Sequence, residues 1–149
     1  MSLDYRLTLA GSTPVEQVAE RALPEPDERP VGTAPLLSVN LYERYGFGVT
    51  VRGGLNGYVD AVSDDGTFEW EPKYYMSVMF HVDKFAERAQ VVINMVTIVR
   101  RVLATGPENA VFVFNGDLLL LTRFDGNVVK HARDKWWSHY PAADQLFPG

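Results

Sequence analysis

Four consecutive leucines, Leu118 to Leu121, follow an Asn-Gly pair and constrain the fold more than any other feature of this sequence. Asn115 and Gly116 tolerate the positive φ angles of a type I′ turn, which is the strongest short signal for a β-hairpin. The pattern therefore predicts two strands, 110–114 and 117–124, joined by this turn. Because successive side chains of a strand point to opposite faces, both faces of the second strand are apolar. We expect that strand to be central in a sheet and covered on both sides.

Two kinds of segment are candidates to cover this central strand. A helix predicted over 84–105, capped by Asp83, carries an apolar stripe that begins at Phe85 and suits one face of the sheet. The opposite face is covered either by the aromatic tail, which contains Trp136 and Trp137, or by a second subunit. In the second case the protein is a homodimer, and the sequence leaves both alternatives open.

The remaining periodic segments predict a small α+β domain. Alternating apolar residues indicate strands at 3–9 and 74–82, and a short amphipathic helix follows the first of them. The glycine-rich stretch GGLNG predicts a turn that makes 47–51 and 58–62 hairpin partners. A chain of this length has the size of one domain, so residues 1–149 are expected to form a single α+β domain. We predict a mostly antiparallel sheet of about six strands, with one short and one long helix packed on it and a short C-terminal aromatic helix.

Two stretches have less definite patterns. Residues 24–35 contain four prolines and no periodicity, so they are predicted to be an exposed loop. Residues 36–45 fit either a strand or a short helix, and the sequence does not decide between the two.

The charge and the cysteine content exclude several classes of protein. The net charge is −5 and the pI about 5.1, which argues against a nucleic-acid scaffold, because such proteins neutralise phosphates with Lys and Arg. There is no cysteine for disulfides or thiolate chemistry. The longest nearly uncharged apolar run, 89–99, is far shorter than the roughly 20 residues that span a bilayer, and the first residues do not resemble a signal peptide. We therefore expect a cytoplasmic protein that binds neither nucleic acid nor membrane.

The sequence contains no recognisable motif for catalysis or cofactor binding. The three histidines, His81, His131 and His139, show neither the spacing nor the companion ligands of a metal site. The glycine cluster lacks the pattern of a phosphate-binding loop, and no serine lies in a nucleophile elbow. We therefore predict no enzyme activity, no catalytic residue, no metal and no cofactor.

The order of elements is similar to that of a known family. The features are a strand and helix at the start (LTLAGSTPVEQVAERAL), a long helix before VFNGDLLLLTRFDG, and an end that bears tryptophans. In this combination the chain resembles the Sit-type (swarming-inhibition) immunity proteins, which are small bacterial proteins of toxin systems. The resemblance implies a non-enzymatic protein that neutralises a cognate bacterial toxin by direct binding. It supplies no catalytic residues, and Asn115, Gly116 and Asp117, which match the hairpin motif, are structural.

The densest run of one charge lies in SDDGTFEWEP, where a turn leads into a short strand at 67–71 and no cation follows before Lys73. An acidic strand with a nearby aromatic suits a docking patch for a basic toxin domain, because charge speeds encounter and aromatic residues anchor binding. The same charges also suit an edge strand that must not aggregate. The candidate partner-binding residues are Asp64, Asp65, Glu69, Trp70 and Glu71.

A second class of function also fits the composition. The chain has three Trp, seven Tyr and eight Phe, which can line a pocket in a small hydrolase or a ligand-binding α+β protein. The alternating apolar pattern carries no convergent polar motif, and this favours the immunity-protein interpretation over the pocket.

Overall fold

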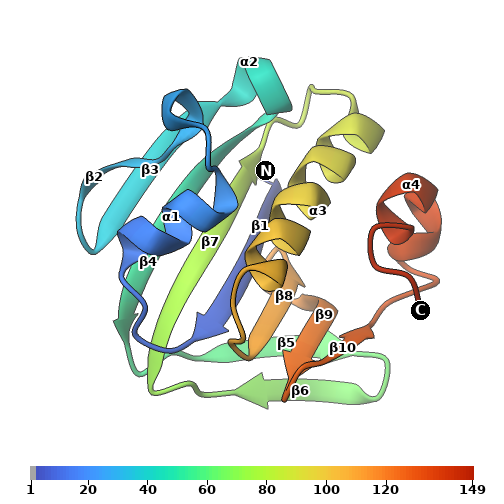
Figure 1. The fold of residues 1–149 in the computed structure, drawn as a ribbon. Coiled ribbons are helices and arrows are strands. Elements are labelled where there is room, and N and C mark those ends of the chain that lie inside the picture. The colour runs from blue at the N-terminus through green and yellow to red at the C-terminus, as the bar shows by residue number, and fades with distance from the viewer. Residues whose placement is uncertain (1–2) are drawn as a thin grey trace.

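A ten-stranded sheet forms the centre of the structure, a computed structural model that describes residues 3–149 (Figure 1). Its strand order is β2-β3-β4-β7-β1-β8-β9-β5-β6, and β10 also pairs with β9. The strands are β1 (Leu3–Ala10), β2 (Val31–Thr33), β3 (Leu36–Leu41), β4 (Phe47–Leu55), β5 (Val59–Ser63), β6 (Gly66–Trp70), β7 (Tyr74–Val82), β8 (Ala110–Phe114), β9 (Leu118–Phe124) and β10 (Asn127–Lys130). The helices are α1 (Val15–Ala22), α2 (Tyr42–Tyr45), α3 (Arg88–Ala104) and α4 (Pro141–Asp144), with the 3₁₀ helices η1 (Pro26–Glu28) and η2 (Trp137–His139).

The prediction of an α+β fold with a sheet of about six mostly antiparallel strands was wrong. Residues 3–149 form ten strands in a mixed sheet, because β5 and β9 pair in parallel at Val62 and Leu118. Two of the additional strands, β2 and β3, form a hairpin in stretches that the sequence predicted as a loop or left undecided. β2 has three residues, too few for an alternating pattern to be visible. Helices form a smaller part than expected, since α3 has 17 residues and each of the other α-helices has eight or fewer.

The glycine-rich stretch near the end of β4 does not join β4 and β5 into a hairpin. Gly54 lies inside β4, opposite Tyr75 of β7, and the strand continues to Leu55. A Cβ on Gly54 would lie 2.9 Å from side-chain atoms of Tyr75, so this glycine permits a close approach of the ring. β5 pairs instead with β6 and, at one residue, with β9. The predicted pairing of 47–51 with 58–62 was therefore wrong.

The helices α1 and α3 lie on one face of the sheet and enclose the larger core (Figure 1). α3 begins at Arg88, and the carboxylate of Glu87 accepts hydrogen bonds from backbone N–H groups of the first turn. The predicted cap at Asp83 was wrong, because the helix begins only at Arg88. The predicted place of Phe85 in the apolar stripe was also wrong, since Phe85 is 86% exposed. No helix within residues 3–149 is long and apolar enough to cross a membrane. The side chains that α3 buries are Val91, Val92, Met95, Val96, Ile98, Val99, Val102 and Leu103.

The hairpin of β5 and β6 covers the opposite face of the sheet at β8 and β9, and in Figure 1 it runs across the lower end of the other strands. A bulge in the β8–β9 ladder places both Leu120 and Leu121 in the larger core. There the ring N–H of Trp137 donates a hydrogen bond to the carbonyl of Leu120 over 2.9 Å. The predicted burial of this strand on both faces is confirmed. The aromatic tail packs on the same face of the sheet as α1 and α3, and the β5–β6 hairpin covers the opposite face. The buried members of the cluster under the hairpin are Val59, Ala61, Val111, Val113 and Leu119.

Leu119→Asp and Leu120→Asp are each expected to abolish cooperative folding. Both side chains are fully buried, one in each apolar cluster, and an unpaired carboxylate there has nothing to offset its lost hydration. The expected loss in the free energy of unfolding exceeds ~4 kcal/mol, measured by urea titration with circular dichroism. Val129→Asp, at a 40% exposed position of β10, is the matched control and should unfold like the parent. A soluble, cooperatively melting variant at either leucine contradicts two-sided burial.

Candidate functional site

The register of the β5–β6 hairpin gives it an inner and an outer face. Val59 pairs with Trp70 and Ala61 with Phe68, and all four side chains pack toward the sheet. Because side chains alternate along a strand, the residues that alternate with these four point outward. We call these exposed outward side chains the acidic face, which consists of Tyr58, Asp60, Val62, Thr67, Glu69 and Glu71.

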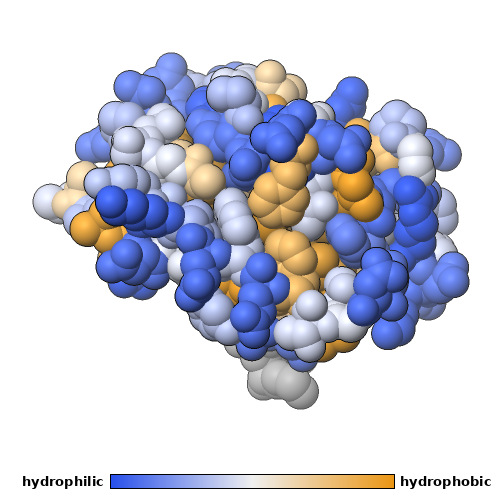
Figure 2. Space-filling model, turned by 90° about the horizontal axis from the view of Figure 1, so that it is seen from below, coloured by the Kyte–Doolittle hydropathy of each residue, from blue (hydrophilic) through white to orange (hydrophobic). Residues whose placement is uncertain are grey.

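Like charges lie opposite one another at the centre of the acidic face. Asp60 pairs in register with Glu69, and Glu71 follows on the same side of the chain. Like charges that lie directly opposite one another destabilise a sheet. None of these three carboxylates has an ion-pair partner within residues 3–149. Partial desolvation raises the pKa of the Tyr58 phenol, and the fields of Asp60, Glu69 and Glu71 raise it further. Figure 2 views the molecule from this lower side, where hydrophilic side chains surround a few hydrophobic ones.

The structure distributes the predicted partner-binding residues over three places. Glu69 and Glu71 lie on the acidic face. Trp70 lies on the inner face, half-buried, and packs edge-to-face on Phe124 with ring centroids 5.4 Å apart. The turn between β5 and β6 contains the other two residues, Asp64 and Asp65. Trp70 therefore contributes to the packing of the hairpin on the sheet.

Asp64 fastens the tip of the hairpin to the loop after β10. Its Oδ2 accepts a hydrogen bond from the backbone N–H of Ala132 over 3.1 Å. Ala132 has a φ of 57°, in the left-handed region that alanine seldom occupies, so this contact supports an unfavourable backbone conformation. Burial lowers the pKa of the neighbouring His131, and the charges of Asp64 and Asp65 partly oppose that change. Both turn carboxylates therefore act on this loop.

Two members of the acidic face, Tyr58 and Asp60, were not among the residues predicted from the sequence. A signal for them was present, because the two-residue turn closes at Ser63 and Gly66. Counting back from that pair along both strands places Asp60 opposite Glu69. The predicted pairing of 58–62 with 47–51 hid this relation.

A cleft of about 490 Å³ lies between the hairpin and the face of β1 that points away from the helices. Tyr58 and Asp60 line it on the hairpin side, and Asp4, Arg6 and Thr8 line it on β1. The cleft thus opens beside the acidic face and shares two residues with it.

Two of the histidines, His81 and His131, lie within hydrogen-bond distance of neighbouring side chains. The Nδ1 of His81 lies 3.1 Å from Oδ1 of Asp4, and its Nε2 lies 3.2 Å from the Thr50 hydroxyl. The Nε2 of His131 lies 3.2 Å from the Thr122 hydroxyl. Within the described chain, no group of three or more His, Asp or Glu side chains is placed to hold a metal ion. The chemistry that the acidic face offers is attraction of cationic groups.

The fold and the site are those of a small protein with an acidic surface hairpin. A family model described as SitI3-like matches residues 3–141. Because the match covers most of the chain, the protein belongs to the SitI3-like family, and the predicted resemblance to the Sit-type immunity proteins is confirmed. No curated protein and no solved structure matches the chain.

Asp64→Ala is expected to lower the free energy of unfolding by about 1 kcal/mol, because the N–H of Ala132 loses its acceptor. Asp64→Asn retains an acceptor oxygen and should lose less. Asp65→Ala, the neighbouring exposed turn position, should stay within about 0.5 kcal/mol of the parent. Urea unfolding curves measure all three variants. Equal effects of Asp64→Ala and Asp65→Ala would argue against a role of Asp64 in fastening the hairpin.

Proposed function

We propose that this chain is an immunity protein that neutralises a cognate bacterial toxin by binding it directly. Membership of the SitI3-like family over residues 3–141 carries the proposal. The protein acts as a single cytoplasmic domain, without catalysis or cofactor, and it works by occluding the toxin.

The acidic face is the proposed contact surface for a basic toxin domain. Asp60 and Glu69 lie on adjacent strands and Glu71 follows directly after β6, so their fields add. Exposed charges act mainly on the rate of encounter, and they are screened over about 8 Å at physiological salt. A basic partner also relieves the repulsion between Asp60 and Glu69 that the free protein contains.

The aromatic anchor of this surface is proposed to be Tyr58, in place of Trp70. Tyr58 is 54% exposed and lies beside Asp60 in the cleft, whereas Trp70 is half-buried against the sheet. Tyrosine is enriched among the residues that dominate binding energies. Asp64 and Asp65 add negative potential at the tip of the hairpin, and they remain part of the proposed contact region.

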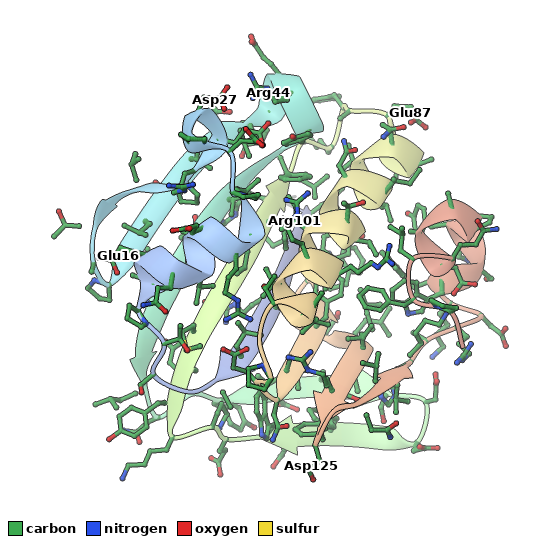
Figure 3. The ribbon with its side chains drawn as sticks, viewed as in Figure 1. Glu16, Asp27, Arg44, Glu87, Arg101 and Asp125 are labelled. Atoms are coloured by element: carbon green, nitrogen blue, oxygen red, sulfur yellow. The ribbon has the colours of Figure 1, made fainter. Side chains whose placement is uncertain are left out.

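The double variant Glu69→Lys and Glu71→Lys is expected to bind the cognate toxin domain at least ~10-fold more slowly at low salt, because electrostatic steering is lost. Surface plasmon resonance at two salt concentrations measures the association rate. The matched control is Glu16→Lys with Glu20→Lys, two exposed positions of α1 that change the net charge by the same amount. Figure 3 shows Glu16 on α1, away from the hairpin.

Two results would count against this proposal at different levels. A folded double variant that associates at the parental rate at low salt contradicts the assignment of the surface. A toxin domain that the parent chain does not bind, and that kills cells expressing the chain, contradicts the function itself.

A further inference from the structure

One edge of β5 is free of strand pairing where it borders the cleft. Among the described residues, β5 pairs with β9 only at Val62, whose N–H donates to the carbonyl of Asp117 over 2.6 Å. In a strand, the N–H and C=O groups of residues i and i+2 point to the same edge. The N–H and C=O of Asp60 therefore point to this edge too, beyond the end of the β9 pairing, and Asp60 lines the cleft.

The cleft has the size and the lining to hold an extended segment of chain. Its volume of about 490 Å³ lies within the range of roughly 300–1,000 Å³ that binding pockets occupy. Asp4, Arg6 and Thr8 of β1 form the wall opposite β5, and Met79 and Val113 add apolar surface. A backbone edge facing a wall of side chains is the arrangement of strand-addition sites, where main-chain hydrogen bonds give affinity and side-chain contacts give specificity.

Charge decides which kind of segment the cleft can take. Asp60 lines the cleft, and Glu69 lies opposite it on β6. Neither carboxylate has an ion-pair partner within residues 3–149. On the opposite wall of the cleft, Oδ1 of Asp4 lies 3.1 Å from Nδ1 of His81. Arg6 adds a positively charged guanidinium group to the same wall. A cationic side chain is therefore attracted to the β5 wall by two carboxylates and repelled from the β1 wall by Arg6.

We propose that the cleft binds an extended segment of the toxin that bears Lys or Arg and adds a strand to the free edge of β5. Main-chain groups of the segment bond the N–H and C=O of Asp60, and its cationic side chain reaches the carboxylates of Asp60 and Glu69. The identity of the partner rests on the proposed function. Charges on a free edge also disfavour pairing with neutral or acidic strands, so the same two carboxylates supply specificity.

A nuclear magnetic resonance titration of the whole chain tests the cleft without requiring the toxin. The probe is the peptide acetyl-Thr-Lys-Val-Lys-Thr-amide, and the matched control is acetyl-Thr-Glu-Val-Glu-Thr-amide. The basic peptide is expected to shift the backbone amide signals of residues 58–60 and of Arg6, and added salt should weaken the effect. The acidic peptide should leave these signals in place. Shifts confined to other parts of the surface, or equal shifts with both peptides, would overturn the inference.

A pair of proline variants separates the backbone contact from the charge. Asp60→Pro removes one carboxylate and the N–H that faces the cleft, but it removes no hydrogen bond of the β5–β6 ladder because that N–H does not point to β6. Glu69→Pro removes the opposing carboxylate and an N–H that faces the outer edge of β6. Asp60→Pro is expected to weaken peptide binding about fivefold more than Glu69→Pro, the effect of losing one hydrogen bond. Asp60→Asn, which retains the N–H, should lie between Asp60→Pro and the parent.

The outcomes for the cleft and for the proposed function can be told apart. If the parent chain binds the toxin domain and Asp60→Pro dissociates no faster than Glu69→Pro, strand addition at β5 is wrong and the immunity function stands. If the parent chain does not bind the toxin domain, the proposed function is wrong, and the peptide titration still decides whether the cleft takes a basic extended segment.

Discussion

The apolar contact between the β5–β6 hairpin and the face of β8 and β9 beneath it is the interaction on which the proposed site depends. The cluster that joins Val59 and Ala61 to Leu119 fixes which side of β5 is inside. Since side chains alternate along a strand, that choice turns Asp60 outward and sets it opposite Glu69. A slip of one residue would turn these carboxylates toward the core, so the leucine-rich strand determines where the negative charge is displayed.

The same contact also leaves an opening beside the hairpin. Asp64 ties the tip to the loop after β10, and Val62 ties the strand to the β8–β9 turn. On the N-terminal side of Val62, β5 is no longer paired with β9 and borders the cleft beside β1. The edge of β5 that faces the cleft is therefore free. Sheets usually protect a free edge by covering it or by placing charge on it. Here the charge is negative and lies next to a groove, which suits recognition of one kind of partner.

The sequence predicted the centre of this structure better than its periphery. Asn115 and Gly116 adopt φ angles of 51° and 74°, as the hairpin signal required, and the leucine run is covered on both faces. The glycine near the end of β4 misled the prediction, because a close approach to Tyr75 and a turn use the same residue type. That error hid the true partner of β5, and with it the pairing of Asp60 with Glu69. The cleft depends on where two strands diverge, which no local pattern encodes.

Hydrogen exchange of the chain in complex with its toxin domain tests the central claim, that the β5–β6 hairpin is the docking element. We predict slower exchange for the amides of residues 58–60 on binding, and for the neighbouring wall of β1 around Arg6. The amides of α1, on the opposite face of the sheet, should exchange at the rates of the free protein. Protection that appears on α1 or on the β2–β3 edge, with the hairpin unchanged, would contradict this account.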